Sequence, residues 1–124
     1  MADITSGFKD AFHLDTNANQ QVEIGRLALP AGAYSIWAKL FIKPSDDRKD
    51  IQFRLQAEGD FDITSASRGG ERSASVALNV VHNFAQSGNV VLTGAHQGDD
   101  GETDLGFIKI TAVRAASLQN NPLP

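Results

Sequence analysis

The sequence contains no cysteine among its 124 residues. This absence excludes a disulfide framework, a zinc–thiolate site, an iron–sulfur cluster and a cysteine nucleophile. Basic residues are also in the minority, because 11 Lys and Arg stand against 15 Asp and Glu and give a formal net charge of −4. Domains that bind nucleic acid carry a clustered basic face, so we expect no nucleic-acid partner.

Long apolar runs are missing as well. No stretch approaches the roughly 18 apolar residues of a membrane-spanning helix, so we expect no membrane insertion. The first residues, MADIT, lack the basic segment and apolar run of a signal peptide. We therefore expect a cytoplasmic protein, or one exported without a classical signal, although a leader removed from a precursor is left open. The length suits a single domain, which we place at residues 1–118, followed by a frayed tail at 119–124.

Alternation of apolar and polar residues dominates the chain and predicts β-strands. Segment 33–43 is the clearest example, because five apolar residues share one face: Tyr34, Ile36, Ala38, Leu40 and Ile42. Further strands are expected at residues 8–14, 22–29, 51–57, 61–67, 76–84, 90–93 and 105–115, with polar loops at 44–50 and 98–104 and turns at 68–71 and 86–89. Segment 74–85 also fits a helical stripe, but its β-branched residues favour a strand.

The count of strands points to a fold class. There is no alternation of strands with helices, which argues against a parallel α/β sheet. There is no internal repeat, which argues against propellers and solenoids. The sequence therefore predicts an all-β, two-sheet antiparallel jelly-roll sandwich of about eight to ten strands.

Three segments together resemble a known family. They are LPAGAYSIWAK at 29–39, HNF at 82–84 with GNVVL at 88–92, and IKITAV at 108–113. Their order resembles small bacterial proteins of the tumour necrosis factor and complement globular-head type of jelly roll. The resemblance implies a homotrimer that binds proteins, sugars or cell surfaces and is not an enzyme. It assigns no functional residue, because the binding loops of that superfamily vary freely.

The strand at 33–43 carries apolar residues on both faces, since Trp37 and Phe41 lie opposite the face of Tyr34. The outer face of a sandwich sheet is normally solvated, and aromatic residues are enriched at subunit interfaces. We therefore predict that Trp37 and Phe41 lie in a homo-oligomeric interface, with a trimer favoured. Two alternatives remain open: a loop that folds over Trp37, or a core that contains Trp37 and leaves Tyr34 outside.

One acidic segment is a candidate calcium site. Calcium binds six to eight oxygen ligands, and clustered carboxylates supply them. The candidate ligands are Asp99, Asp100, Glu102 and Asp104. Their spacing does not match an EF-hand loop, and the alternative is a solvated hairpin loop. No other cofactor is expected.

The three histidines form no His-x-His pair, so a zinc or cupin-like site would depend on the fold gathering them. They are His13, His82 and His96. We expect His82 to be a core histidine with a hydrogen bond to the backbone. His96 precedes the acidic segment and is the most plausible functional histidine.

Catalytic motifs are not found, since the sequence has neither a Gly-x-Ser-x-Gly elbow nor a Ser-x-x-Lys motif. Asp60 and Asp62 share one strand face, whereas a glycosidase dyad lies across a cleft. We therefore expect a non-enzymatic trimeric binding module. The alternative is a carbohydrate-binding jelly roll, with or without calcium. A sugar site needs an exposed ring, and the position of both Trp37 and Tyr34 inside a strand counts against it.

Overall fold

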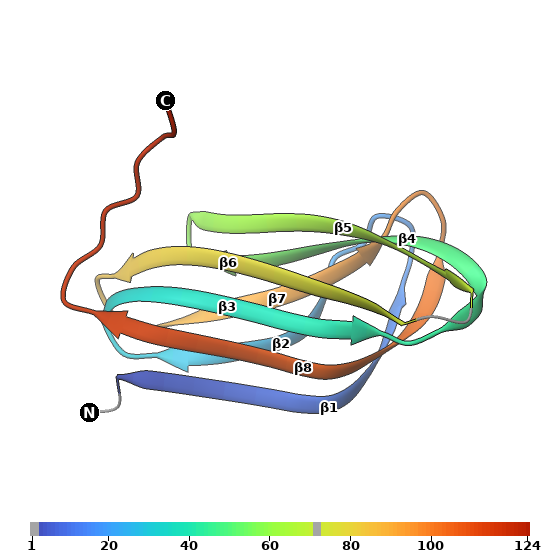
Figure 1. The fold of residues 1–124 in the computed structure, drawn as a ribbon, viewed down its shortest axis with the longest axis horizontal. Helices are drawn as coiled ribbons and strands as arrows, with labels where there is room; N and C mark the ends of the chain where they lie inside the picture. Colours follow the sequence, from blue (N-terminus) through green and yellow to red (C-terminus); the bar gives the residue numbers. More distant parts are fainter. Residues whose placement is uncertain (1–2, 71–72) are drawn as a thin grey trace.

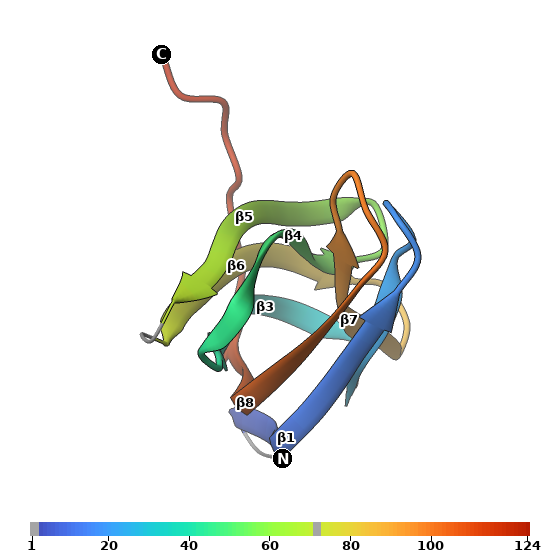
Figure 2. The ribbon, with the colours of Figure 1, turned by 90° about the vertical axis from the view of Figure 1, so that its right-hand side faces the viewer.

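The computed structural model describes residues 3–70 and 73–124, and all the regular secondary structure in these residues is β-strand. The eight strands follow the chain as β1 (Ile4–Thr16), β2 (Val22–Leu29), β3 (Gly32–Ile42), β4 (Ser45–Ala57), β5 (Asp60–Gly70), β6 (Ala74–Phe84), β7 (Gly88–His96) and β8 (Gly101–Ala115). They lie in two layers (Figures 1 and 2).

The two sheets have the strand orders β1-β8-β3-β6 and β2-β7-β4-β5, which we call sheet A and sheet B. Strands pair from the two ends of the chain inward, so that β1 pairs with β8, β2 with β7, β3 with β6 and β4 with β5. All of these pairs are antiparallel. This is the topology of a long hairpin rolled into two sheets, and it confirms the predicted jelly-roll sandwich.

The core lies between the two sheets. It is formed by the residues of each strand that point inward, in alternation with residues that point to solvent. In β3, Ile36, Ala38 and Leu40 are buried, and in β4 the same pattern buries Ile51, Phe53 and Leu55. Tyr34 is also buried, and its hydroxyl donates a hydrogen bond of 2.9 Å to the carbonyl oxygen of Pro30. Burial of these side chains supplies the main driving force for folding, at about 1.5–3 kcal/mol for each large apolar residue.

Both predicted polar loops are shorter in the structure. The 44–50 loop is wrong because β4 begins at Ser45, and the 98–104 loop is wrong beyond residue 100 because β8 begins at Gly101. Residues 101–104 pair with residues 13–16 of β1. A polar segment can join a sheet when its charged side chains point to solvent.

The remaining segments differ less from expectation. Segment 74–84 is a strand and not a helix. The turn expected at 68–71 is wrong for residues 68–70, because β5 continues to Gly70, and residue 71 lies outside the described residues. Residues 117–124 form no strand and lead away from the sandwich (Figure 1). No helix in the described part of the chain is long and apolar enough to cross a membrane.

Candidate functional site

The outer face of sheet A carries an unusual group of exposed aromatic rings. The exposed fractions are 77% for Phe8, 54% for Trp37, 42% for Phe41 and 66% for Phe107. These four residues, here called the aromatic face, come from the three neighbouring strands β1, β3 and β8. Single exposed apolar residues are ordinary, but a group of large ones on one face marks an interaction site.

Alternation along β3 explains the position of two of these rings. Trp37 stands between the buried residues Ile36 and Ala38, so its side chain must leave the opposite face of the sheet. Phe41 follows in the same phase, and its ring meets that of Phe107 edge to face at a centroid distance of 5.6 Å. The alternative in which Trp37 enters the core and Tyr34 stays outside is therefore wrong. No described segment covers the Trp37 ring, since more than half of it is exposed.

Phe107 reaches the aromatic face through a backbone irregularity. Its φ angle is 51°, in the left-handed region that a bulky side chain seldom adopts. The register between β3 and β8 shifts by one residue at this point, as in a β-bulge. The left-handed conformation costs about 1–2 kcal/mol for a residue with a Cβ atom. Strain of this kind is concentrated at functional sites.

Two lysines lie at the centre of the aromatic face. Lys39 of β3 and Lys109 of β8 are direct cross-strand partners, and Phe8 of β1 is the next partner in the same row. We call Lys39 and Lys109 the lysine pair. Both side chains are exposed.

The lysine pair lines two neighbouring hollows. One hollow of about 290 Å³ is lined by Phe8, Phe107 and both lysines, together with Lys9, Asp10 and Ile108. The other, of about 320 Å³, is lined by Trp37, Thr111 and both lysines, together with Ala38 and Ala77. Each hollow therefore has at least one exposed ring in its wall and shares the two lysine side chains with the other. Volumes near 300 Å³ are at the lower end of the range for small-molecule sites.

Polar groups complete the row that contains Trp37. Thr111 is its cross-strand partner in β8, and the hydroxyls of Thr111 and Ser6 lie 3.2 Å apart. Asn79 is its partner in β6 and donates a hydrogen bond of 2.8 Å to the carbonyl oxygen of Ile36. The hydroxyls offer hydrogen bonds beside the ring, while the Asn79 side chain is held against the backbone.

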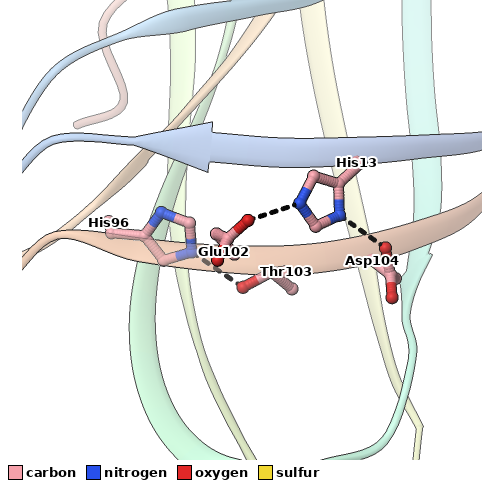
Figure 3. A network of polar contacts seen from close by, with 5 residues as sticks. All are labelled: His13, His96, Glu102, Thr103 and Asp104. Carbon is pink, nitrogen blue, oxygen red and sulfur yellow. Dashed lines mark hydrogen bonds and ion pairs between the residues drawn. The ribbon is translucent and has the colours of Figure 1, made fainter.

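The acidic segment is divided in the structure. Glu102 and Asp104 lie on β8 on either side of the His13 ring of β1 (Figure 3). His13 Nδ1 lies 2.7 Å from Asp104 Oδ1, and His13 Nε2 lies 3.0 Å from Glu102 Oε1. Asp100 Oδ1 instead accepts a hydrogen bond of 2.8 Å from the amide of Ala18, and Asp99 is exposed in the loop before β8. The four predicted calcium ligands therefore do not converge, and no group of three or more His, Asp or Glu in the described residues is placed to hold a metal ion.

His96 is a structural residue and not the functional histidine that its sequence position suggests. Its side chain is buried, and Nδ1 lies 2.9 Å from Thr16 Oγ1. Nε2 lies 2.7 Å from Thr103 Oγ1 (Figure 3). The contacts join β7 of sheet B to β1 and β8 of sheet A. The prediction of a functional role for His96 rested on its position before the acidic segment. That position does not show whether the ring points to solvent or into the space between the sheets.

His82 also differs from its prediction. Its partners are carboxylates and not a backbone group: Nδ1 lies 2.7 Å from Asp60 Oδ2, and Nε2 lies 2.6 Å from Glu58 Oε1. Asp62, the second member of the predicted acidic pair, accepts a hydrogen bond of 2.9 Å from the amide of Asn79. Asp60 and Asp62 thus connect β5 of one sheet to β6 of the other and have a structural role.

These ion pairs predict a pH dependence of stability. Hydrogen bonds that the His13 ring donates to Asp104 and then to Glu102 raise the pKa of His13 to about 9. Partial burial lowers the pKa of His82, but its bonds to Asp60 and Glu58 outweigh burial and raise the pKa overall. A raised pKa in the folded state stabilises the fold below the unfolded value of about 6.5, and this contribution is lost as the pH rises through the folded value.

We therefore expect the free energy of unfolding to decrease from about pH 6.5 towards about pH 9. Urea unfolding across this range measures the slope, and His82→Gln should make it shallower. Titration of the ring protons by NMR provides an independent check. A midpoint at or below about pH 6.5 for both His13 and His82 would contradict the ion pairs.

Comparison with known proteins identifies no family. No family model matches the chain, and neither does any curated protein. Among solved structures, the chain is similar to part of an arabinose-bound α-L-arabinofuranosidase, with 11% identity, a TM-score of 0.46 and coverage of 90% of this chain and 23% of the other. It is also similar to the CBM22-1 xylan-binding domain of Paenibacillus barcinonensis Xyn10C, with 14% identity, a TM-score of 0.43 and coverage of 89% and 88%.

A third similar structure is the CBM36-1 domain of a multidomain xylanase from the hindgut metagenome of Trinervitermes trinervoides. It has 13% identity and a TM-score of 0.39, and the match covers 91% of this chain and 100% of the other. At these identities the likeness concerns the fold alone, and the function must be inferred from the residues of this chain.

Proposed function

We propose that the protein is a non-catalytic carbohydrate-binding module whose aromatic face holds a polysaccharide chain. The observation that carries the proposal is the pair of neighbouring hollows, each with an exposed ring in its wall and each sharing the lysine pair. Two such hollows side by side can accept successive sugar units of one chain.

The chemistry of the face suits sugars. A pyranose ring has apolar C–H faces, which pack against aromatic rings, and hydroxyls at its edge, which need hydrogen-bond partners. Trp37 supplies a ring in one hollow, and Phe8 and Phe107 supply rings in the other. The lysine amino groups and the Thr111 hydroxyl supply the polar partners. Trp37 can serve a sugar site although it lies within a strand, because its side chain points away from the core and is exposed.

The conformation of Phe107 gives further support. A glycine would adopt the φ angle of 51° without penalty, whereas phenylalanine does so at a cost. The ring is mostly exposed and contributes little burial in return. A role in contacting a ligand would explain why this backbone conformation is kept although it lowers the stability of the fold.

A panel of soluble polysaccharides tests the proposal. Native affinity electrophoresis measures retardation of the wild-type protein in neutral and acidic polymers, and calorimetry with oligosaccharides measures the affinity, with calcium and with a chelator. We expect retardation by at least one polymer without a requirement for calcium, because Glu102 and Asp104 are already bound by His13. Failure to bind any polymer under either condition would overturn the proposal.

A second candidate is the homotrimeric binding module implied by the tumour necrosis factor resemblance. The apolar character of the outer face favours it, since Ile4 and Val113 are exposed cross-strand partners beside the aromatic face. The lysine pair disfavours it, because lysine is depleted in the centre of protein interfaces and an apposed copy would add like charges. Light scattering distinguishes the two: a stable trimer that is disrupted by Trp37→Glu supports the interface, and a monomer excludes it.

A further inference from the structure

We infer that the polysaccharide is acidic, and that the lysine pair binds uronate carboxylates carried on or beside its main chain. This inference rests on the proposed function and specifies its ligand. The observation behind it is the placement of two like charges at the boundary that both hollows share.

The lysine pair has an unfavourable arrangement in the free protein. Lys39 and Lys109 are directly opposite across β3 and β8, where Cβ atoms are about 4.5–5.5 Å apart. Like charges at such positions destabilise a sheet. Among the residues that the structure describes, no ion pair engages either amino group. An anion between them would relieve the repulsion and gain two charge-assisted hydrogen bonds.

The two hollows form a basic part of the surface of an acidic protein. The chain has a net charge of −4, yet the side chains lining the two hollows include three lysines and one carboxylate, Asp10. Lys9, the third lysine, donates a hydrogen bond of 2.7 Å to the carbonyl oxygen of Ile24, so its amino group is directed towards β2. Glu102 and Asp104 of the same sheet are held by His13. Among the residues that line the two hollows, the lysine pair is therefore the cationic group available between the rings.

The position of the pair selects the kind of anion. A carboxylate between the hollows would lie between two neighbouring sugar rings, one against Trp37 and one against Phe8 and Phe107. A uronic acid in the chain, or a uronate branch on it, provides a carboxylate at such a position. A neutral chain could fill both hollows but would leave the two ammonium groups without an ionic partner.

Matched polymers test the charge without changing the sugar backbone. The probes are polygalacturonate and glucuronoxylan, each beside its carboxyl-reduced form, and neutral arabinoxylan. Polygalacturonate carries uronates in the main chain and glucuronoxylan carries them as branches. The comparison therefore distinguishes recognition of a main-chain uronate from recognition of a branch uronate. We expect at least one native polymer to bind about tenfold or more tightly than its reduced form, because each charge-assisted bond is strong. Raising the salt concentration from about 0.05 M to about 0.5 M should weaken this binding several-fold.

Charge variants identify the residues. Lys39→Gln and Lys109→Gln should each weaken binding of the acidic polymer about tenfold, whereas Lys49→Gln makes the same charge change away from the aromatic face and should leave binding unchanged. Neither lysine-pair variant should lower the unfolding temperature, since each removes a like-charge contact. Equal binding of native and reduced polymers, or full binding by both lysine variants, would overturn the inference and leave the proposed function standing. Absence of binding to every polymer would overturn both.

Discussion

Replacing Trp37 by alanine is expected to weaken polysaccharide binding at least tenfold, which corresponds to about 1.4 kcal/mol. The ring forms a wall of one hollow and is 54% exposed, so it is available to a sugar and contributes little to the core. Surface substitutions usually change the free energy of unfolding by less than about 0.5 kcal/mol. Calorimetry measures the first effect, and urea unfolding measures the second.

A matched control exists on the other sheet. Phe61 of β5 is 51% exposed, and the guanidinium group of Arg54 lies 4.1 Å from its ring centroid. Phe61→Ala removes an aromatic ring of similar exposure from sheet B and should leave binding unchanged. An equal loss of affinity in both variants, or full affinity in Trp37→Ala, would exclude the aromatic face as the binding site.

The second large effect is expected for a buried aromatic ring of the core. Phe53→Ala is expected to lower the free energy of unfolding by about 3–5 kcal/mol. Phe53 of β4 is fully buried opposite Gly94 of β7, where its ring and the side chains of Leu14 and Ile24 fill the space beside the glycine. Removal of the ring loses its burial and leaves a cavity that a rigid sandwich fills only in part.

Urea unfolding of Phe53→Ala and Phe53→Leu measures this effect. The leucine variant keeps most of the apolar volume and should lose clearly less stability than the alanine variant. A loss below about 1 kcal/mol in Phe53→Ala would mean that the two sheets do not enclose this ring as described. The contrast with Trp37→Ala then separates the residues that hold the fold from those that face the ligand.

Much of the fold follows from the sequence because strands such as β3 and β4 alternate clearly with a period of two. The phase of β3 assigns Tyr34 to the core and Trp37 to the outer face, and the structure agrees. The phase of β4 likewise assigns Phe53 to the core. The period and phase of the apolar residues depend only on neighbouring positions, so they can be determined from the sequence without knowledge of the strand pairing. The proposed interface role of Trp37 and Phe41 is a separate matter and stays a prediction.

The candidate site was only partly predictable because it depends on register between distant strands. Lys39 and Lys109 become neighbours through the pairing of β3 with β8, which no local pattern specifies. Phe107 could have been noticed from its phase, since it alternates with the core residue Ile108. Phe8 has an analogous place in β1. The bulge lies at Gly106 and Phe107, and the glycine beside Phe107 is a local sign of it in the sequence.

The ion pairs were unpredictable for the same reason. His13 contacts Glu102 and Asp104 across separations of 89 and 91 residues. His82 meets Asp60 where an edge strand of one sheet lies beside an edge strand of the other. Sequence alone identifies such residues as titratable, but only the rolled arrangement of the sheets supplies their partners.

The single tryptophan permits the most direct measurement of the central claim. Trp37 is the only tryptophan in the chain, so its fluorescence reports on the aromatic face without labelling. Titration with an oligosaccharide of the polymer that binds should shift the emission to shorter wavelength and saturate at the affinity found by calorimetry. Calorimetric binding with no change in the emission of Trp37 would place the ligand elsewhere and contradict the account.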